Sequence, residues 1–383
     1  MEYFLGMWVQ QDLDLGTFWL TQCPYWEHIL LWFNLDNVTP RNVPLPPGII
    51  LDSDMSPKTE SEKREMKDNP YHLILSLVIW GQLATCLDLS FSVSLLARFQ
   101  ANLGIEHWWA LMHVIGYIKN TIDYGLTYSC EFDLSPSAFV DTDYGGCRDT
   151  RRSTSGYVFT MAGGAVTWSS KWQATISLST VKAEYVALSR CGQQMVWMHS
   201  WLNEVDIKYS QPGVIKGDSH GAITLTMKYH GKIKHIDIQH HYIWELIQSG
   251  TIQVKQIPSA DNLVDLFTKS LPHDHHHWLL TSLNISPFSS MGECWIISRT
   301  AYHVYHQSII LIWLTPYTTF YFSPFSLHSL PTFPPFIYSC IHILTIYCND
   351  YSQSLLPHQL RVSLAYTSYF HTFTYTLFYH SYL

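Results

Sequence analysis

The sequence predicts an α/β fold in which residues 138–286 build a five-stranded mixed sheet covered by helices. The first observation is a short apolar stretch followed by two stretches in which apolar and polar residues alternate, as they do in half-buried β-strands. The second is a long stretch after them with apolar residues three or four positions apart, which is typical of a buried helix face. The third is that two more strand-like stretches follow, separated by helical patterns.

The first strand is predicted over Ala138–Val140, an apolar stretch that we expect to place Asp141 at its end. The segment SGYVFTMAGGAVTWSSK then predicts a hairpin, because its two alternating halves flank the glycine pair at 163–164, a strong two-residue turn signal. Asp143 lies beyond the expected strand end, so we expect it to contribute to a site only indirectly.

A long helix is predicted to begin after Ser179, because serine is a preferred residue at helix N-caps. Apolar residues recur at helical spacing behind it, and Glu184 falls within the first two turns. A strand over Gly213–Lys216 then leads to Asp218, and a short helix is expected to follow.

The end of this region predicts one more strand between helices. HIDIQHHYIWELIQSG has a helical pattern closed by Gly250, a residue type that commonly ends helices. TIQVKQIP alternates like an edge strand. Asp261 or Ser259 is then expected to open a final helix that carries Asp265.

Four acidic residues stand out because each follows or lies within one of these patterns: Asp141, Glu184, Asp218 and Asp265. If the fold brings them together, their negative charges repel one another unless a cation lies between them. Carboxylate oxygens are the ligands that hard divalent cations prefer. The sequence therefore predicts a divalent-metal site built from these four residues.

The net charge of −8 is distributed unevenly over the 383 residues. Residues 1–137 hold 7 lysines and arginines against 16 acidic residues, whereas residues 138–286 hold 13 against 12. Such an acidic first segment argues against a protein that binds nucleic acid freely through a basic surface.

The cysteines and the hydropathy pattern point to the inside of the cell. The eight cysteines form no C-x-x-C pair and no zinc-site spacing with histidine, so we expect free thiols in a reducing compartment. The start of the chain lacks the basic segment and apolar run of a secretory signal, and no uninterrupted apolar run is long enough to span a bilayer. We expect an intracellular protein, cytoplasmic or nuclear, without stable membrane association.

The first segment is predicted to be largely helical after some alternating stretches such as TFWLTQ. CPYWEHILLWFNL predicts a helix, and the proline-rich stretch VTPRNVPLPPGI follows as a linker. KTESEKREMKDNP predicts a short solvated helix, and residues 71–98 suit a buried helical pair. EHWWALMHVIGYIKNT predicts another helix with one apolar face.

Several stretches of this segment, among them YFLG, SPKTESEKREM, LARFQANLGIEHW and YIKNTIDYGLTYS, resemble the end of the reverse transcriptase of copia-type retrotransposons. The resemblance implies the late palm, thumb and connection of a polymerase. The Y-x-D-D turn that binds metal in that family does not occur in this sequence, so polymerase activity is not expected.

From residue 138 onward the motifs DTDYGGCRDTRRSTSGYVF, IKHIDIQHHYI and LVDLFTKSL closely resemble the ribonuclease H (RNase H) domain of the same elements. The predicted element order is also that of the RNase H fold. The resemblance implies an endonuclease that cuts the RNA strand of RNA–DNA hybrids with two Mg²⁺ or Mn²⁺ ions. Its catalytic and metal-binding acids would be Asp141, Glu184, Asp218 and Asp265.

Basic residues near the first hairpin and before the later helix are candidates for contacts with nucleic-acid phosphates. We select Arg151, Arg152, Lys171 and Lys234. Ordinary surface charge is the alternative interpretation. The run His273–His277, which contains four histidines, is expected to be a solvated stretch rather than a metal site.

Two departures from the family favour a second hypothesis about function. Lys182 stands where the family usually has an acid, two residues before Glu184, and Ser219 follows Asp218 where the family usually has asparagine. A lysine there could partly neutralise the acids and compete with metal. The alternative is therefore a catalytically inactive retrotransposon relic with at most a nucleic-acid-binding or interaction role.

The predicted organisation has three parts: a reverse-transcriptase remnant over 1–137, an RNase H-like domain over 138–286, and a tail over 287–383. The tail is rich in aromatic residues, serine and proline, has almost no charged residues and shows no amphipathic period, so we expect poor order there. Removing everything after Ser286 is expected to leave the RNase H-like part folded.

Overall fold

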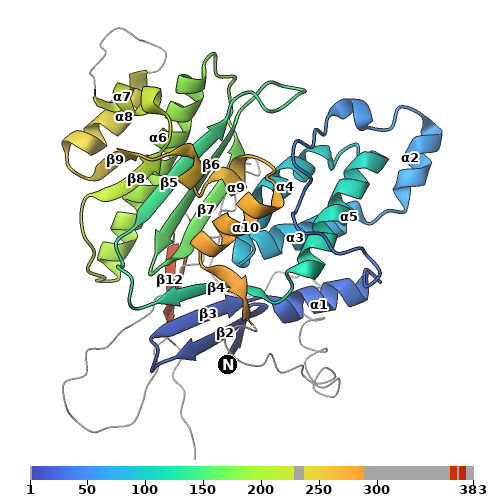
Figure 1. Ribbon diagram of the computed structural model, residues 1–383, viewed down its shortest axis with the longest axis horizontal. Coiled ribbons are helices and arrows are strands. Elements are labelled where there is room, and N and C mark those ends of the chain that lie inside the picture. Colours follow the sequence, from blue (N-terminus) through green and yellow to red (C-terminus); the bar gives the residue numbers. More distant parts are fainter. Residues whose placement is uncertain (1, 228–236, 289–362, 369–370, 377–383) are drawn as a thin grey trace, which may run out of the picture. The chain divides into compact units, whose positions relative to one another are not determined.

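The computed structural model describes residues 2–227, 237–288, 363–368 and 371–376 (Figure 1). Residues 1–287 belong to one compact unit. None of the helices in these ranges combines the length and the apolar character that a membrane span needs. Most of the tail, and with it the expectation of poor order, lies outside the described residues. Within it the strands β11 (Ser363–Ser368) and β12 (His371–Thr376) pair as an antiparallel hairpin.

The central sheet has five strands in the spatial order β7-β6-β5-β8-β9. They are β5 (Ser137–Asp143), β6 (Thr154–Met161), β7 (Gly164–Trp172), β8 (Gly213–Gly217) and β9 (Ile252–Gln256). The first three pair antiparallel, whereas β8 runs parallel to both β5 and β9. In this mixed sheet three consecutive strands come first, and two strands that each follow a helix complete it. This order confirms the predicted RNase H-like fold.

Five helices accompany this sheet in Figure 1: α6 (Thr180–Glu204), α7 (His220–Met227), α8 (Asp237–Gln248), α9 (Asp265–Thr268) and α10 (His273–Ser282). Ser179 caps α6 as predicted, because its side chain accepts a hydrogen bond from the Lys182 backbone N–H. Gly250 follows α8 with a positive φ of 71°, a conformation that glycine adopts at little cost.

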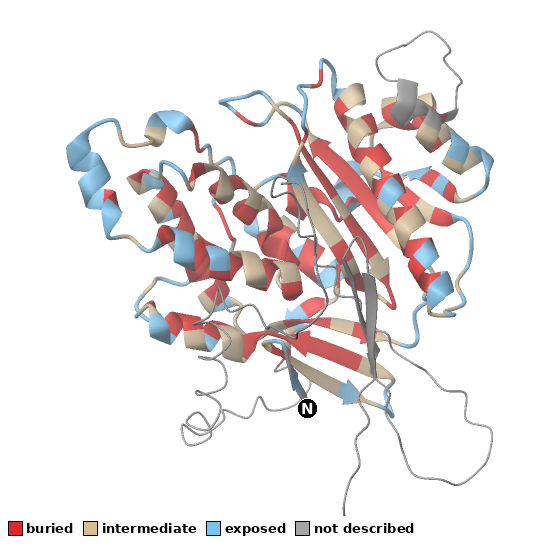
Figure 2. Ribbon diagram, turned by 180° about the vertical axis from the view of Figure 1, so that it is seen from behind, coloured by how far each residue is buried: buried red, intermediate tan, exposed pale blue. Residues whose placement is uncertain are grey.

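Side chains of β5 alternate between two hydrophobic cores, one on each face of the sheet. Ala138 and Val140 pack with residues of α6 such as Met195. Phe139 packs on the other face with residues of α9 and α10, among them Phe267. Much of the central sheet is accordingly coloured as buried in Figure 2. The side chain of Asp141 lies on the same face of the sheet as Phe139, which is the face toward α9.

A second sheet of five antiparallel neighbours has the order β1-β2-β3-β4-β10. Its strands are β1 (Glu2–Phe4), β2 (Met7–Asp12), β3 (Thr17–Thr21), β4 (Tyr124–Ser129) and β10 (Ile285–Pro287). The last strand therefore returns from the RNase H-like part to pair with the first segment.

The helices predicted in the first segment are confirmed. They are α1 (Cys23–Trp32), α2 (Glu60–Lys67), α3 (Tyr71–Ala84), α4 (Ser90–Leu96) and α5 (Ile105–Asn120), with short 3₁₀ turns η1 (Ser53–Met55), η2 (Leu87–Leu89) and η3 (Ala97–Phe99) between them. The helices α1, α3, α4 and α5 share one buried core.

A second core connects the two segments. Phe18 and Leu126 of the first segment belong to the same cluster as Phe139 and Leu279 of the RNase H-like part. The division between residues 137 and 138 therefore stays a prediction about ancestry, because the two segments fold against each other.

Two details differ from the predicted strands. The first strand is longer than expected and runs to Asp143, because Thr142 and Asp143 keep pairing with Ser155 and Thr154. The hairpin turn lies at residues 162–163 rather than at the glycine pair, with positive φ at both positions. Two successive positive φ values are the conformation of a type I′ turn, which matches the twist of the strands.

Candidate metal centre

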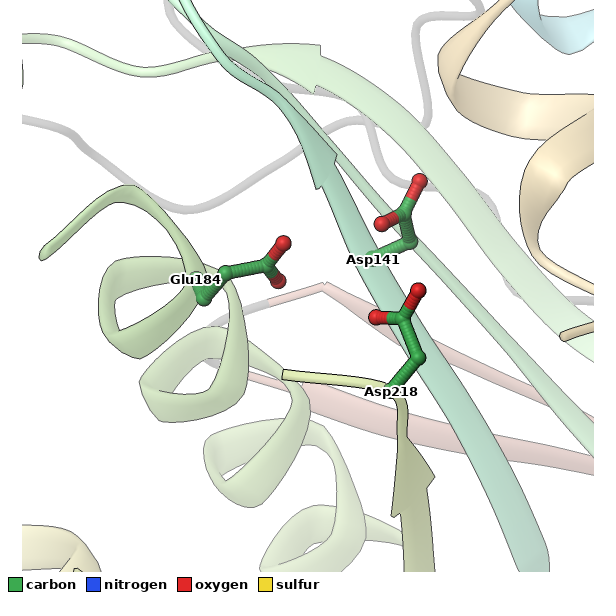
Figure 3. Close-up of side chains that lie close together, drawn as sticks. All are labelled: Asp141, Glu184 and Asp218. Carbon is green, nitrogen blue, oxygen red and sulfur yellow. The ribbon is translucent and has the colours of Figure 1, made fainter. Parts of the chain in front are cut away.

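Three of the four predicted acids converge at one end of the central sheet. Asp141 lies on β5, Glu184 on α6, and Asp218 directly after β8 (Figure 3). One carboxylate oxygen of each lies within 4.8 Å of the other two. The fold thus brings together three of the acids that the sequence singled out.

The strand register explains why Asp141 and Asp218 meet. The neighbouring parallel strands β5 and β8 pair Phe139 with Lys216, so each acid stands two residues beyond this pair. Parallel neighbours end at the same edge of a sheet, and equivalent positions on them lie side by side. Glu184 reaches the same edge because α6 begins there, after its cap at Ser179.

Burial and mutual repulsion make it energetically unfavourable for all three carboxylates to be ionised at once without a cation. Asp141 is only 7% exposed, and burial raises its pKa above the ordinary value. Burial, followed by the charges of Asp141 and Asp218, raises the pKa of Glu184 to about 9. A divalent cation between the carboxylates would remove this penalty, so the donor set fits a hard metal ion such as Mg²⁺ or Mn²⁺.

Hydroxyl groups from the segment around α9 orient two of the acids. Thr268 Oγ1 donates a hydrogen bond of 2.6 Å to Asp141 Oδ2, and Ser259 Oγ donates one of 2.5 Å to Asp218 Oδ2. Such bonds fix carboxylate orientation in metal sites. Sequence reasoning missed both hydroxyls, although Thr268 lies inside the LVDLFTKSL motif that supplied Asp265.

The close approach of α9 to the sheet depends on Gly156, the β6 residue paired with Asp141. A Cβ atom at this position would lie 2.9 Å from Thr268 Cγ2 and 3.0 Å from Phe267 Cβ. Glycine therefore allows α9 to pack directly on the strand, and this contact brings the Thr268 hydroxyl to Asp141.

The fourth predicted acid, Asp265, lies outside the group of three carboxylates. It is the first residue of α9, is 4% exposed, and forms an ion pair of 2.8 Å with Lys269 Nζ one turn later. Burial raises the pKa of Asp265, and the hydrogen bond and charge of Lys269 oppose that rise.

Lys269 is the cation of this site, and sequence reasoning did not anticipate it. Burial alone would lower its pKa, but the hydrogen bond that Lys269 donates to Asp265 and the charges of Asp265, Asp141 and Asp218 raise it above the ordinary value. The sequence indicated Lys182 as the residue that neutralises the acids, whereas the structure gives Lys269 an ion pair with Asp265 and an electrostatic interaction with Asp141 and Asp218.

Asp143 serves the turn after β5. Its Oδ1 accepts hydrogen bonds from the backbone N–H groups of Gly146 at 2.9 Å and Thr154 at 3.4 Å. Burial raises the pKa of Asp143, and these hydrogen bonds oppose the rise. An acid used in this way supports the loop beside the site, in agreement with the indirect contribution expected of it.

The predicted nucleic-acid contacts lie at one edge of the sheet. Arg151 is exposed with a φ of 54°, Arg152 is half-buried in the same loop, and Lys171 is exposed near the end of β7. Lys234 lies outside the described residues. Beside them the Arg98 guanidinium stacks over the Trp172 ring at 4.4 Å.

The histidines of the run His273–His277 differ in their exposure to solvent. His276 is 3% exposed and its ring meets the Tyr117 ring edge-on, with centroids 5.4 Å apart. Burial lowers its pKa to about 3. The expectation of a solvated run is therefore wrong for His276, because the buried face of α10 passes through this position, whereas His273 and His277 are exposed.

Comparison with known proteins shows what the chain is similar to. No family model matches the sequence. The chain is 33% identical over 275 residues to the retrovirus-related Pol polyprotein from transposon TNT 1-94 of Nicotiana tabacum, which covers 71% of this chain and 21% of that protein. The Pol polyprotein from transposon RE2 of Arabidopsis thaliana is 34% identical over 186 residues, 48% of this chain and 13% of that protein.

The chain is a relative of the copia-type Pol polyproteins of plant transposons. It spans about a fifth of the length of the TNT 1-94 polyprotein and less of the RE2 polyprotein. The solved structure of LC11-RNase H1, isolated from compost by a metagenomic approach, is 18% identical over 35% of this chain and 93% of its own, with a TM-score of 0.29. Because this score is low, the fold of this Pol segment is assigned from its strand order.

Proposed function

We propose that this Pol segment is a metal-dependent endonuclease of the RNase H type that cuts the RNA strand of RNA–DNA hybrids. The observation that carries the proposal is the convergence of Asp141, Glu184 and Asp218 within 4.8 Å at the edge of an RNase H-like sheet. Similarity to a copia-type Pol polyprotein supports the same activity.

The three converging carboxylates would hold Mg²⁺ or Mn²⁺, and Asp265 would complete a site for two ions. Divalent ions in such a site activate a water molecule and stabilise the leaving oxygen of a phosphodiester. Carboxylates must be ionised to bind a cation. Glu184, whose pKa is raised to about 9, therefore has to lose its proton when the site is loaded.

The residues around the acids have supporting roles in this proposal. Thr268 and Ser259 keep the oxygens of Asp141 and Asp218 in place through the hydrogen bonds described above. Arg151, Arg152, Lys171 and Lys234 would contact the phosphates of the hybrid, since basic side chains bind nucleic acid chiefly through its backbone.

One observation favours the alternative of an inactive relic. Lys269 pairs with Asp265 at 2.8 Å and so keeps a positive charge beside the proposed centre. If this pair persists when hybrid is present, the site lacks its fourth carboxylate and the chain at most binds nucleic acid.

A cleavage assay separates the two functions. The full chain is incubated with an RNA–DNA hybrid labelled on the RNA strand, in Mg²⁺ or Mn²⁺, beside the variants Asp141→Asn and Glu184→Gln. We expect RNA cleavage by the unsubstituted protein only, and none in EDTA. Undiminished cleavage by Asp141→Asn would point to a contaminating nuclease, and no cleavage by any form would leave only the relic hypothesis. Primer extension is not expected.

A further inference from the structure

Gln173, the residue that follows β7, has a side chain that is almost completely enclosed. It is 1% exposed. A buried primary amide is costly unless its two N–H groups and its carbonyl oxygen find partners. The partners of Gln173 come from four different parts of the central fold.

The amide nitrogen of Gln173 joins a helix to a strand. Nε2 donates to the Ala183 carbonyl at 2.8 Å and to Ser155 Oγ at 2.9 Å, and it lies 3.4 Å from Thr142 Oγ1. The Ala183 carbonyl can only accept a hydrogen bond, which fixes the nitrogen of the amide on this side.

The amide oxygen holds the loop that leads into α6. Oε1 accepts a hydrogen bond of 2.8 Å from Ser177 Oγ, and the Gln173 backbone N–H donates to the Ser153 carbonyl at 2.9 Å. The orientation of the amide is therefore determined from both ends, so the group cannot rotate without losing bonds to two elements.

Two of these contacts fall next to the candidate metal ligands. Thr142 directly follows Asp141 on β5, and Ala183 directly precedes Glu184 on α6. Thr142 Oγ1 in turn donates to the Thr154 carbonyl at 2.9 Å, so it is anchored on β6 as well. One buried amide thus connects the strand that carries the first acid to the helix that carries the second.

We propose that Gln173 is a positioning residue that sets the distance between Asp141 and Glu184. The inference rests on the proposed metal centre for its consequence, although its geometry stands without any ion. A cluster of like charges pushes its members apart, and a short chain of hydrogen bonds through a buried amide opposes that movement.

The test compares Gln173→Leu with Tyr128→Phe in the full chain. Tyr128→Phe is a matched control, because it also removes a buried side-chain hydrogen bond of the central sheet, from Tyr128 Oη to the Ala165 carbonyl of β7 at 2.6 Å, away from the acids. Hydrogen exchange of backbone amides at residues 141–143 and 183–185 is measured without metal, and Mn²⁺ binding is measured by calorimetry.

We expect Gln173→Leu to speed exchange in both segments and to weaken Mn²⁺ binding roughly 10- to 100-fold, the usual effect of losing a group that orients metal ligands. Tyr128→Phe should change neither quantity, even if both variants lower the melting temperature equally. Ser177→Ala removes one contact of the amide and should have a smaller effect of the same kind. If Gln173→Leu does not fold, the exchange and Mn²⁺ affinity of Ser177→Ala test the proposal in its place.

The outcomes also separate this inference from the proposed function. If the unsubstituted chain binds no Mn²⁺ but Gln173→Leu loosens both segments, the positioning role stands and the metal centre is wrong. If Mn²⁺ binds and the exchange and affinity of both Gln173→Leu and Ser177→Ala equal those of the control, the positioning role is overturned.

Discussion

Asp265 and Lys269 form an ion pair of 2.8 Å that spans α9, and the charges of Asp141 and Asp218 also act on Lys269. Lys269 thus supplies the site with a positive charge that belongs to the protein rather than to a bound metal ion. This arrangement predicts that the metal-free protein relies on Lys269 and that an incoming cation has to compete with it.

Replacing Lys269 by methionine should therefore separate stability from metal binding. We expect the metal-free protein to lose on the order of 1 kcal/mol of unfolding free energy, a modest value because the lysine side chain is 49% exposed and partly screened by solvent. Mn²⁺ should bind more tightly, since a competing cation is gone. Urea unfolding and calorimetric titration measure the two effects.

Lys255→Met on β9 is the control for loss of one positive charge from the same sheet. It should change neither quantity. An unchanged Mn²⁺ affinity in Lys269→Met would show that the lysine does not compete for the site.

The raised pKa of Glu184 predicts a particular pH dependence of stability. Its value of about 9 lies above the ordinary 4.5, so the folded protein keeps a proton that the unfolded chain releases between these limits. Stability from this group is complete below the lower value and is lost as pH rises toward the higher one, by at most about 1.4 kcal/mol per pH unit.

Urea unfolding in EDTA between pH 6 and pH 8.5, a range inside this window, measures the effect. Glu184→Gln has no titrating carboxyl at this position and should give a shallower decline. Equal slopes in the two proteins would mean that the Glu184 carboxyl is not held in a buried, crowded position.

Gly156→Ala should act on the site through packing alone. The added Cβ would meet Thr268 Cγ2 at 2.9 Å, so α9 has to move away from β6. Overpacking of this kind typically costs about 1–3 kcal/mol. We expect loss of stability together with weaker Mn²⁺ binding, because the Thr268 hydroxyl no longer reaches Asp141, and calorimetry would detect both.

Glycine at 217 offers the comparison for Gly156. A Cβ there would lie 3.4 Å from the nearest atom, Val140 Cγ1, which is ordinary contact. Gly217→Ala should therefore be tolerated better than Gly156→Ala, and the reverse order would contradict the packing account.

The shared core predicts that the two segments depend on each other. Residues 138–288 expressed alone would lose the β4 partner of β10 and the contacts of Phe18 and Leu126 with Leu279. We expect this fragment to unfold at a lower temperature than residues 1–288, or without a cooperative transition. Equal melting temperatures would support 138–286 as an independent domain.

The sequence was sufficient for the acids and the order of the elements, because both are written in local patterns. Asp141 and Asp218 come directly after the short stretches predicted as strands, and Glu184 follows a recognisable cap at Ser179. The end of β5 was placed too early because the pairing of Asp143 with Thr154 depends on a partner strand. The local sequence does not indicate that pairing.

The supporting residues could not be predicted from local sequence patterns, because their roles also depend on distant partners. Gln173, Thr268 and Lys269 act through contacts made only when distant parts of the chain pack together. His276 was misjudged because polar neighbours conceal that its position faces the core. The pairing of Lys269 with Asp265, four residues apart, was the one contact that helical spacing could have suggested.

Anomalous diffraction from crystals of the protein grown with Mn²⁺ tests the central claim most directly. The account predicts a manganese peak between the carboxylates of Asp141, Glu184 and Asp218, absent from crystals of Asp141→Asn. A peak elsewhere on the chain, with none among these three side chains at saturating Mn²⁺, would contradict the assignment of this cluster as the metal centre.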